Sequence, residues 1–422
     1  MNRLPPGWVE MTLGEACDVL DSQRVPVNAE ERGRRPGNVP YYGATGPVGW
    51  IDEALFDEEL VLLGEDGAPF LDPNKHKAYM IHGPAWVNNH AHILRARSVT
   101  SNRLLLHALN AVDYRPYVNG TTRLKLTQAA MKAIPLVLPP LAEQRRIVAA
   151  VEEHFSRLDA AEVALWSAER RIGALEKSII TEASSTLAPP QHWKIVTVAD
   201  AGTVGLGLQR SPKRHKGPNM RPYLRVANVF EDRIDDSDVM SMDITDAEWE
   251  RYQLRNGDVL LNEGQSPELL GRPAIYRGKP PDVAFTNSLI RFIVNADIDP
   301  EWALLVFRSH LHNRRFMRES QITTNIAHLS AGRFKTVEFP VPPLDEQHAR
   351  VAHARLRLES CARLRAEVAA GRRRSAVLRR SVLDAAFSGR LIPQDSDQGS
   401  VSGLLEQVAV SPMARHGKVR AS

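Results

Sequence analysis

The sequence predicts a mixed α/β protein in which two globular domains alternate with two long helices that pair as an antiparallel coiled coil. The first observation behind this prediction is a repeated motif, LPPLAEQRRIVAAV from Leu138 and VPPLDEQHARVAHA from Val341. The second is a heptad spacing of apolar residues after each copy. The third is a set of short β-branched runs, interrupted by glycine and proline, that fills the rest of the chain. A pseudo-two-fold internal repeat accounts for all three.

The repeat extends well beyond the motif, which indicates duplication of a whole domain. One constant offset aligns the PPL and EQ letters of both motifs and holds without a gap from about Thr121 to Ser185. Earlier regions repeat more loosely: PPGWVEMTLGEA resembles PPQHWKIVTVADA, and LVLLGEDG resembles DVLLNEGQ. The period far exceeds the ~20 to 50 residues of a solenoid repeat. A chain of 422 residues also exceeds one ordinary hydrophobic core.

Prolines and composition set the boundaries of the segments. Pro139 and Pro140 cannot lie inside a helix, so they mark the start of the first one, and Pro189 with Pro190 closes that region. After Pro393, the letters QDSDQGS form a polar linker before a basic tail. We therefore expect globular domains at residues 1–138 and 187–341, spacer helices at 139–186 and 342–392, and a polar C-terminal tail at 393–422.

Both globular segments contain short strand-like runs and one helical stretch. The runs are VPYYGATGPVGWI, ELVLLGEDGAPF and AWVNNHAHILRA in the first segment, and RPYLRVANVF, GDVLLNEGQ and VAFTNSLIRFIV in the second. β-Branched and aromatic residues between glycine and proline turns favour strands. The periodicity of SNRLLLHALNAV and PEWALLVFRSHLHNRRFMRE predicts one helix in each segment.

Both spacer helices have the heptad spacing of a coiled-coil seam. In the first helix, the first seam position is held by Val151, Leu158, Leu165, Ile172 and Ile179. In the second helix, it is held by Ala354, Cys361, Val368, Ser375 and Val382. We assign the second seam position three residues later, at Ala161, Ala168 and Leu175 in the first helix and Leu364, Leu378 and Ala385 in the second. Small residues in the second helix would let the two helices approach closely.

The two helices carry opposite net charges. Residues 141–185 contain six Lys or Arg and eight Asp or Glu, whereas residues 344–388 contain ten and five. Opposite charges at flanking positions favour pairing of the two helices with each other. The alternatives for the stretch RLRAEVAAGRRRSAVLRR are contact with DNA and simple exposure to solvent. Pairing and DNA contact are compatible, because a paired helix keeps an outer face.

Composition excludes several classes of protein. The chain has 54 Lys and Arg against 50 Asp and Glu, a net charge of +4, so a nucleic-acid surface requires local clustering of charge. Cys17 and Cys361 are too few for a disulfide framework or a cysteine-rich zinc site. The N-terminus lacks an apolar signal core, and no apolar run approaches the ~20 residues that span a bilayer. We expect a cytoplasmic protein without membrane contact.

Motifs for catalysis are missing from the sequence. Gly278-Lys279 is followed by proline, where a phosphate loop requires serine or threonine. No lysine has the acidic residue two positions earlier that metal-dependent nucleases use, and the Pro-Pro pairs lack the Asn or Asp of an amino-methyltransferase. His90 and His92 alternate along a predicted strand, which favours a polar strand face over a metal pair. We expect no catalytic residue, no metal site and no cofactor in this chain.

Residues suited to binding are therefore the main candidates. The stretch LQRSPKRHKGPNMRPYLR combines positive charges with glycine and proline in a way that suits a phosphate backbone, with a solvated loop as the alternative. NGTTRLKL and QITTNIAHL occupy equivalent places before each spacer helix, where their side chains can contact bases or form a capping cluster. The candidate DNA-binding residues are Tyr42, Thr45, Asn88, Asn89, Thr121, Thr122, Arg123, Lys125, Arg210, Lys213, Arg214, Lys216, Arg221, Asn287, Thr323, Thr324 and Asn325.

This organisation resembles the specificity subunit of type I restriction-modification systems. The resemblance is carried by LPPLAEQRRIVAAVEE with VPPLDEQHARVA, by RRSVLDAAFSGRLIP, by the opening LPPGWVEMTLGEACDVL, and by VPYYGATGPVGWID with LLLGEDGAP. It extends to about Pro393, and the double PPL-x-EQ pattern is its specific part. It implies that residues 1–138 and 187–341 are target-recognition domains and that the spacer helices pack antiparallel.

The resemblance also implies partners and cofactors. A specificity subunit has no catalytic centre of its own and binds double-stranded DNA. It holds modification subunits, which methylate adenine with S-adenosylmethionine, and restriction subunits, which use ATP; magnesium is likewise expected in the partners. Recognition domains diverge most within the family, so the resemblance does not identify base-reading residues.

The spacer helices are expected to act as a ruler. About 45 residues at a rise of ~1.5 Å span roughly 65 Å, comparable with about two turns of DNA. Two dissimilar domains related by a pseudo-two-fold axis then predict a bipartite, asymmetric target with an unread gap. The alternative is a non-catalytic coiled-coil scaffold whose globular domains bind protein; the missing motifs disfavour a methyltransferase or a nuclease.

Overall fold

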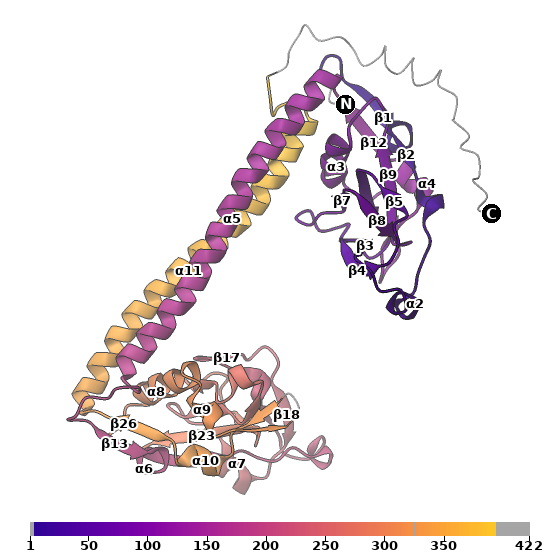
Figure 1. Ribbon diagram of the computed structural model, residues 1–422. Coiled ribbons are helices and arrows are strands. Elements are labelled where there is room, and N and C mark those ends of the chain that lie inside the picture. Colours follow the sequence, from indigo (N-terminus) through magenta and orange to yellow (C-terminus); the bar gives the residue numbers. More distant parts are fainter. Residues whose placement is uncertain (1–3, 324–325, 394–422) are drawn as a thin grey trace. The chain divides into compact units, whose positions relative to one another are not determined.

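A computed structural model describes residues 4–323 and 326–393 of the chain. Contacts divide the chain into two compact units: unit 1 comprises Met1–Leu165 and Ala369–Ser422, and unit 2 comprises Trp166–Val368. Each unit contains one globular domain and part of each long helix (Figure 1). Among the described residues, no helix is long and apolar enough to cross a membrane.

The globular domain of unit 1 is built on two four-stranded sheets. Strand β6 is buried along its whole length because its sequence LVLLG is apolar on both faces. Helix α3 (Asn102–Ala111) begins after the capping residue Ser101 and packs on the sheet that contains β6. The first sheet has the order β2 (Cys17–Val19), β9 (Ala91–Ala96), β6 (Leu60–Gly64) and β7 (Ala78–Ile81). The second has the order β4 (Pro47–Ile51), β3 (Val39–Tyr42), β8 (Pro84–Val87) and β5 (Phe56–Asp57).

The globular domain of unit 2 repeats this plan with different details. Helix α8 (Pro300–His312) packs on the larger sheet, and Phe307 contacts Phe292 and Phe334 in the core. The larger sheet has the order β14 (Gly202–Leu206), β23 (Leu289–Val294), β19 (Val259–Asn262) and β21 (Pro273–Ile275). The smaller has the order β18 (Met240–Asp243), β15 (Met220–Leu224) and β22 (Ala284–Phe285). A further sheet contains β20 (Gly264–Gln265), β25 (Ile326–His328) and β24 (Gln321–Thr323).

One predicted helix is divided in the structure. The stretch PEWALLVFRSHLHNRRFMRE forms α8 and a separate short helix α9 (Arg315–Arg318). Arg314 between them has a φ of 54°, a left-handed conformation that ends a helix. The predicted helix in SNRLLLHALNAV is confirmed as α3.

A short antiparallel strand pair closes each globular domain at the point where the long helix begins. In unit 1, β1 (Val9–Thr12) pairs with β12 (Pro135–Leu138). In unit 2, β13 (Lys194–Thr197) pairs with β26 (Glu338–Val341). The two prolines of each repeated motif follow β12 and β26, so they separate a strand from a helix as the sequence predicts.

The two spacer segments form single helices of 44 residues each. Helix α5 covers Leu141–Ser184 and helix α11 covers Leu344–Phe387. In unit 2, Arg365 of α11 pairs with Glu176 of α5 at 2.8 Å. In the same unit, the earlier residue Arg357 of α11 pairs with the later residue Glu182 of α5 at 2.9 Å. As the residue number rises along α11, the number of the partner residue on α5 falls. The helices are therefore antiparallel, as predicted.

The first seam position lies between the two helices. Val151, Ile172 and Ile179 of α5 are buried, and Leu158 and Leu165 are half-buried. On α11, Cys361 and Val368 are buried and Val382 is half-buried. A Cβ atom on Gly371 would lie 3.1 Å from Leu165 Cδ2, which shows how closely the helices approach there.

The second seam position was assigned wrongly. Leu364 and Leu378 are 52% and 51% exposed, so they lie outside the contact with α5. The position facing the partner helix is one residue later, at Arg365 and Arg379. Arg365 pairs with glutamates at the corresponding position of α5, whereas Arg379 pairs with Asp159 and lies 3.9 Å from Glu162. Arg365 binds Glu169 at 3.0 Å. A search for apolar residues misses such a column, although long charged side chains cover a seam with their aliphatic stems.

Candidate nucleic-acid interface

Several loops meet at one end of the globular domain of unit 1. Strands β3 and β8 run parallel, so the residues that follow them lie at the same edge of the sheet. The backbone N–H of Asn88 donates to the carbonyl of Tyr42 at 3.0 Å, and that of Glu65 donates to the carbonyl of His90 at 2.8 Å. The backbone N–H of Leu126 donates to the carbonyl of Glu65 at 2.7 Å. The segment around Leu126, which precedes α5 in the chain, therefore lies at the same end of the domain.

The structure brings the unit 1 candidates together at this end, and their exposure differs. The turn that holds Thr45 lies against β6, since a Cβ on Gly64 would be 3.1 Å from the carbonyl oxygen of Ala44. Tyr42 is half-buried. Asn88 is buried, and its Oδ1 accepts the backbone N–H of His90 at 2.8 Å, so it shapes the turn rather than faces a ligand. The exposed candidates are Thr45, Asn89, Thr121, Thr122, Arg123 and Lys125.

A carboxylate in the turn after β6 holds one of these candidates in place. Asp66 Oδ1 accepts Arg123 Nη2–H at 2.7 Å and lies 2.7 Å from His90 Nδ1. Gly67 has a φ of 70°, so the turn itself is present. The contact between Asp66 and Arg123 was missed because no periodicity joins residues so far apart in the chain.

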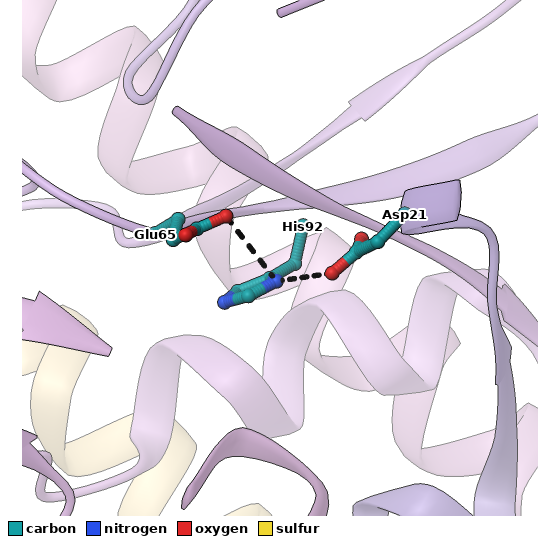
Figure 2. Close-up of side chains that lie close together, drawn as sticks. All are labelled: Asp21, Glu65 and His92. Atoms are coloured by element: carbon teal, nitrogen blue, oxygen red, sulfur yellow. Dashed lines mark hydrogen bonds and ion pairs between the residues drawn. The ribbon is translucent and has the colours of Figure 1, made fainter. Parts of the chain in front are cut away.

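Directly beside these loops lies a buried cluster of Asp21, Glu65 and His92 (Figure 2). His92 Nδ1 lies 2.6 Å from Asp21 Oδ2, and Nε2 lies 2.9 Å from the carbonyl oxygen of Leu126. Both ring nitrogens thus have a polar partner. The ring connects β9 to the segment that carries Thr121 and Arg123.

This cluster is balanced in charge by protein side chains. Arg24 Nη1–H donates to Glu65 Oε2 at 2.7 Å, and Lys125 Nζ lies 3.1 Å from Glu65 Oε1. Burial alone would raise the pKa of the Asp21 carboxyl, but His92 and the backbone N–H of Ile93 hold it below its usual value. The two carboxylates are thus matched by the two cations Arg24 and Lys125. We therefore assign the cluster to structural support rather than to metal binding.

His90 and His92 do not share a face as a metal pair. Each has its own carboxylate, Asp66 for His90 and Asp21 for His92. The two histidines therefore support different parts of the interface. His90 positions the carboxylate that binds Arg123, whereas His92 holds the backbone of Leu126.

The equivalent end of unit 2 has the same backbone connections. Glu263 follows β19 as Glu65 follows β6, and its N–H donates to the carbonyl of Ser288 at 3.0 Å. The N–H of Leu329 donates to the carbonyl of Glu263 at 2.8 Å, and the N–H of Thr286, just before Asn287, donates to the carbonyl of Leu224 at 3.0 Å. Asn287 is exposed at this end. Thr323 ends β24 here, whereas Thr324 and Asn325 lie outside the described residues.

The basic stretch of unit 2 is more structured than the predicted loop. Arg221 lies in β15 and pairs with Asp246 of helix α7 (Asp246–Tyr252). Arg214 donates to both carboxylate oxygens of Glu248 on α7, at 3.0 and 2.7 Å. The arginine's hydrogen bonds lower the pKa of Glu248 to about 2. These two arginines hold α7 against the sheet.

Three cations of the same stretch face outward. Arg210 is exposed, with its guanidinium carbon 5.7 Å from the ring centre of Tyr223. Lys213 and Lys216 are also exposed, and no ion-pair partner is found for either within the described part of the chain. Arg210, Lys213 and Lys216 are therefore the cations of this stretch best placed to reach a phosphate.

Comparisons with known proteins agree on one family. The model for the type I restriction modification DNA specificity domain matches residues 5–163 and 190–352. A Haemophilus influenzae protein assigned by name as a type I restriction enzyme specificity subunit is 25% identical over 340 residues, 80% of this chain and 84% of its own length. The EcoKI specificity subunit of Escherichia coli K12 is 21% identical over 349 residues, 77% of this chain and 75% of its own length.

A solved structure shares the fold. It concerns the complex assembly and conformational transition of the type I R-M system, and one of its chains matches with a TM-score of 0.70 at 17% identity. The match covers 92% of this chain and 100% of the solved one. Because the family model matches both repeats, each with a globular domain and the start of its long helix, the chain belongs to the type I restriction modification DNA specificity family.

Proposed function

We propose that each globular domain reads one half of a bipartite, asymmetric DNA target, and that α5 and α11 set the gap between the halves. The main observation behind this proposal is that the chain contains the same domain fold twice, with different side chains in each copy. The same end of each domain gathers exposed polar and basic residues, including Arg123 in unit 1 and Arg210 in unit 2. Two domains that share a fold but differ in their side chains are expected to bind half-sites of different sequence.

The chain contributes recognition, and the chemistry belongs to its partners. Modification subunits supply adenine methylation with S-adenosylmethionine, and restriction subunits supply ATP-driven, magnesium-dependent cleavage. Such a complex works on DNA in the cytoplasm. The chain itself acts as a non-catalytic subunit, consistent with its lack of motifs for phosphate-loop, nuclease or methyltransferase chemistry.

A set of exposed apolar side chains on the long helices forms the proposed docking surface for the modification subunits. Val163 of α5 is 70% exposed, and Leu356 and Val377 of α11 are both 63% exposed. Leu364 and Leu378 add to this surface because they face away from α5. Large apolar side chains along the outside of a helix pair are typical of a protein interface.

The test is to map methylated adenines in cells that express this chain with its modification subunit. We expect one bipartite sequence with two different halves and a fixed gap. Arg123→Ala should relax one half, and Asn287→Ala, at the equivalent end of unit 2, should relax the other, because both side chains are exposed there. Glu153→Gln on the exposed face of α5 serves as the control and should change neither half.

A contiguous target, or variants that affect both halves alike, would contradict the proposal. If no adenine is methylated although the modification subunit co-purifies with the chain, a protein-binding scaffold becomes the better interpretation.

A further inference from the structure

The glutamate of each repeated motif ties a long helix to the first strand of the preceding domain. In unit 1, Trp8 Nε1–H donates to Glu143 Oε2 at 3.1 Å. Trp8 directly precedes β1, Glu143 lies in the first turn of α5, and both side chains are buried. The start of the domain is therefore fixed to the start of the helix.

The neighbouring glutamine makes a second connection. Gln144 Nε2–H₂ donates to the carbonyl of Val99 at 2.8 Å and to that of Pro139 at 2.9 Å. Val99 lies just before α3, and Pro139 directly follows β12. Gln144 is 2% exposed, so no water competes for these bonds. The side-chain amide of Gln144 thus connects α5 to the segment just before α3 and to the proline pair at the start of α5.

The same connections recur in unit 2 at the residues that the repeat aligns. Trp193 Nε1–H donates to Glu346 Oε2 at 3.2 Å. Gln347 Nε2–H₂ donates to the carbonyls of Asp297 at 3.0 Å and Pro342 at 2.9 Å. We call Trp8, Glu143 and Gln144 the joint of unit 1, and Trp193, Glu346 and Gln347 the joint of unit 2. The domains differ elsewhere, so the joint is a property of the shared architecture.

A small rotation at a joint has a large effect at the reading end of the domain. A domain of about 140 residues has a radius of gyration of roughly 14 Å, which places its far surface about 35 Å from an anchor at its edge. A tilt of roughly 6° then moves that surface by about 3.5 Å, close to the ~3.4 Å rise of one base. A ruler accurate to one base pair therefore needs a rigid joint as well as a helix of fixed length.

We propose that the residues of the two joints are positioning residues that fix the number of base pairs between the half-sites. This inference rests on the proposed bipartite target and adds to it a second determinant of the gap. The joint residues do not touch DNA. They act by holding each reading surface at one angle to its helix.

Gln144→Glu is the sharpest test, because it is nearly isosteric and replaces both N–H donors with an oxygen that faces two carbonyls. Gln347→Glu makes the same change in unit 2. Trp8→Phe removes the indole N–H and keeps an aromatic ring in the site. Glu143→Gln keeps an acceptor for Trp8 and is the conservative variant. Glu153→Gln, on the exposed face of the same helix, is the control.

The readout is the distribution of gap lengths among methylated sites in cells that express the complete complex. We expect Gln144→Glu and Gln347→Glu to leave both half-sites unchanged and to raise methylation at gaps one base pair shorter or longer by at least tenfold. Trp8→Phe should act in the same direction with a smaller rise. Glu143→Gln and Glu153→Gln should keep the single wild-type gap.

Two results would overturn the inference. One is a wild-type gap distribution with full methylation in Gln144→Glu, Gln347→Glu and Trp8→Phe. The other is a uniform loss of methylation at the native gap with no new gap lengths, which is the result of simple instability. A wild-type complex whose target is not bipartite would instead refute the proposed function, so the two failures are distinguishable.

Discussion

Individual cations of the candidate interface divide into those with a partner inside the protein and those that face solvent. Arg214 and Arg221 belong to the first group, since carboxylates of α7 bind them. Lys213 and Lys216 belong to the second and are exposed. Counterion release on DNA binding depends on charges that reach phosphates. The two lysines should therefore contribute to affinity, and the two arginines to stability.

Replacing Lys213 and Lys216 with alanine should weaken DNA binding without changing the half-sites. Each lost phosphate contact lowers the slope of log affinity against log salt by about 0.9, so the double variant should lose about 1.8. Fluorescence anisotropy of the complete complex on its target duplex, measured over a salt series, gives this slope. Lys194→Ala in β13 is the control. An unchanged slope would remove the two lysines from the interface.

The buried cluster around His92 makes a second prediction at this scale. Asp21→Asn would remove the carboxylate that His92, Gln128 and the backbone of Ile93 contact, a loss of about 2 kcal/mol for buried hydrogen bonds to a charged group. The backbone N–H of Ile93, which donates to Asp21 Oδ1 at 2.9 Å, should then exchange its hydrogen faster at pH 6. Asp18→Asn, whose ion pair with Arg97 is half exposed, should change exchange little.

The pH dependence of this stabilisation follows from the lowered pKa of Asp21. A carboxyl whose pKa is lower in the folded state stabilises the fold above its unfolded value of 3.8 and loses that effect as the pH falls through the folded value. The difference between wild type and Asp21→Asn should therefore be full at pH 6 and shrink below about pH 4. If the difference in stability between wild type and Asp21→Asn persists unchanged at pH 2, its cause is not the ionisation of Asp21.

At the scale of elements, adjacent residues of α11 face different surroundings. Arg365 faces α5 and binds Glu169 and Glu176 at 3.0 and 2.8 Å. Leu364 faces away from α5 and is 52% exposed. Helix pairing and partner docking thus use different columns of the same helix. Neighbouring substitutions can separate the two.

The same substitution at these two positions should have different effects. Arg365→Glu adds a third carboxylate to Glu169 and Glu176 and should destabilise the helix pair by about 1 kcal/mol, a modest figure because the pairs are partly exposed. Urea unfolding followed by circular dichroism measures this loss, and Glu169→Arg with Glu176→Arg should restore it. Leu364→Glu should leave stability within about 0.5 kcal/mol but reduce co-purification of the modification subunit. Equal effects of both substitutions on stability would contradict this division.

For the whole molecule, the antiparallel pairing allows matched changes in helix length. Deleting residues 158–164 from α5 and 372–378 from α11 removes one heptad from each helix and keeps the seam in phase. Seven residues span about 10.5 Å, so the preferred gap should shorten by up to about three base steps of ~3.4 Å. Methylation mapping should show both half-sites unchanged. An unaltered gap would contradict the role of the helices as a ruler.

The sequence predicted the architecture because the repeat and the heptads depend on local spacing. Val151, Ile172 and Ile179 were found in this way, and they are buried. The charged column of the seam was missed because Arg365 and Glu169 resemble solvent-exposed residues until their partners are known. The joint of Trp8 with Glu143 was missed because the contact joins distant parts of the chain, and only the fold brings them together.

The charged column also bears on the history of the duplication. The internal repeat aligns Arg365 with Glu162 and Arg379 with Glu176. A single ancestral half with the sequence of the first repeat, paired with its own copy, would place Glu162 between the Glu169 and Glu176 of that copy. Like charges at such sites repel. We therefore expect each half to pair poorly with a second copy of itself, so that the charged column favours pairing of the two different halves.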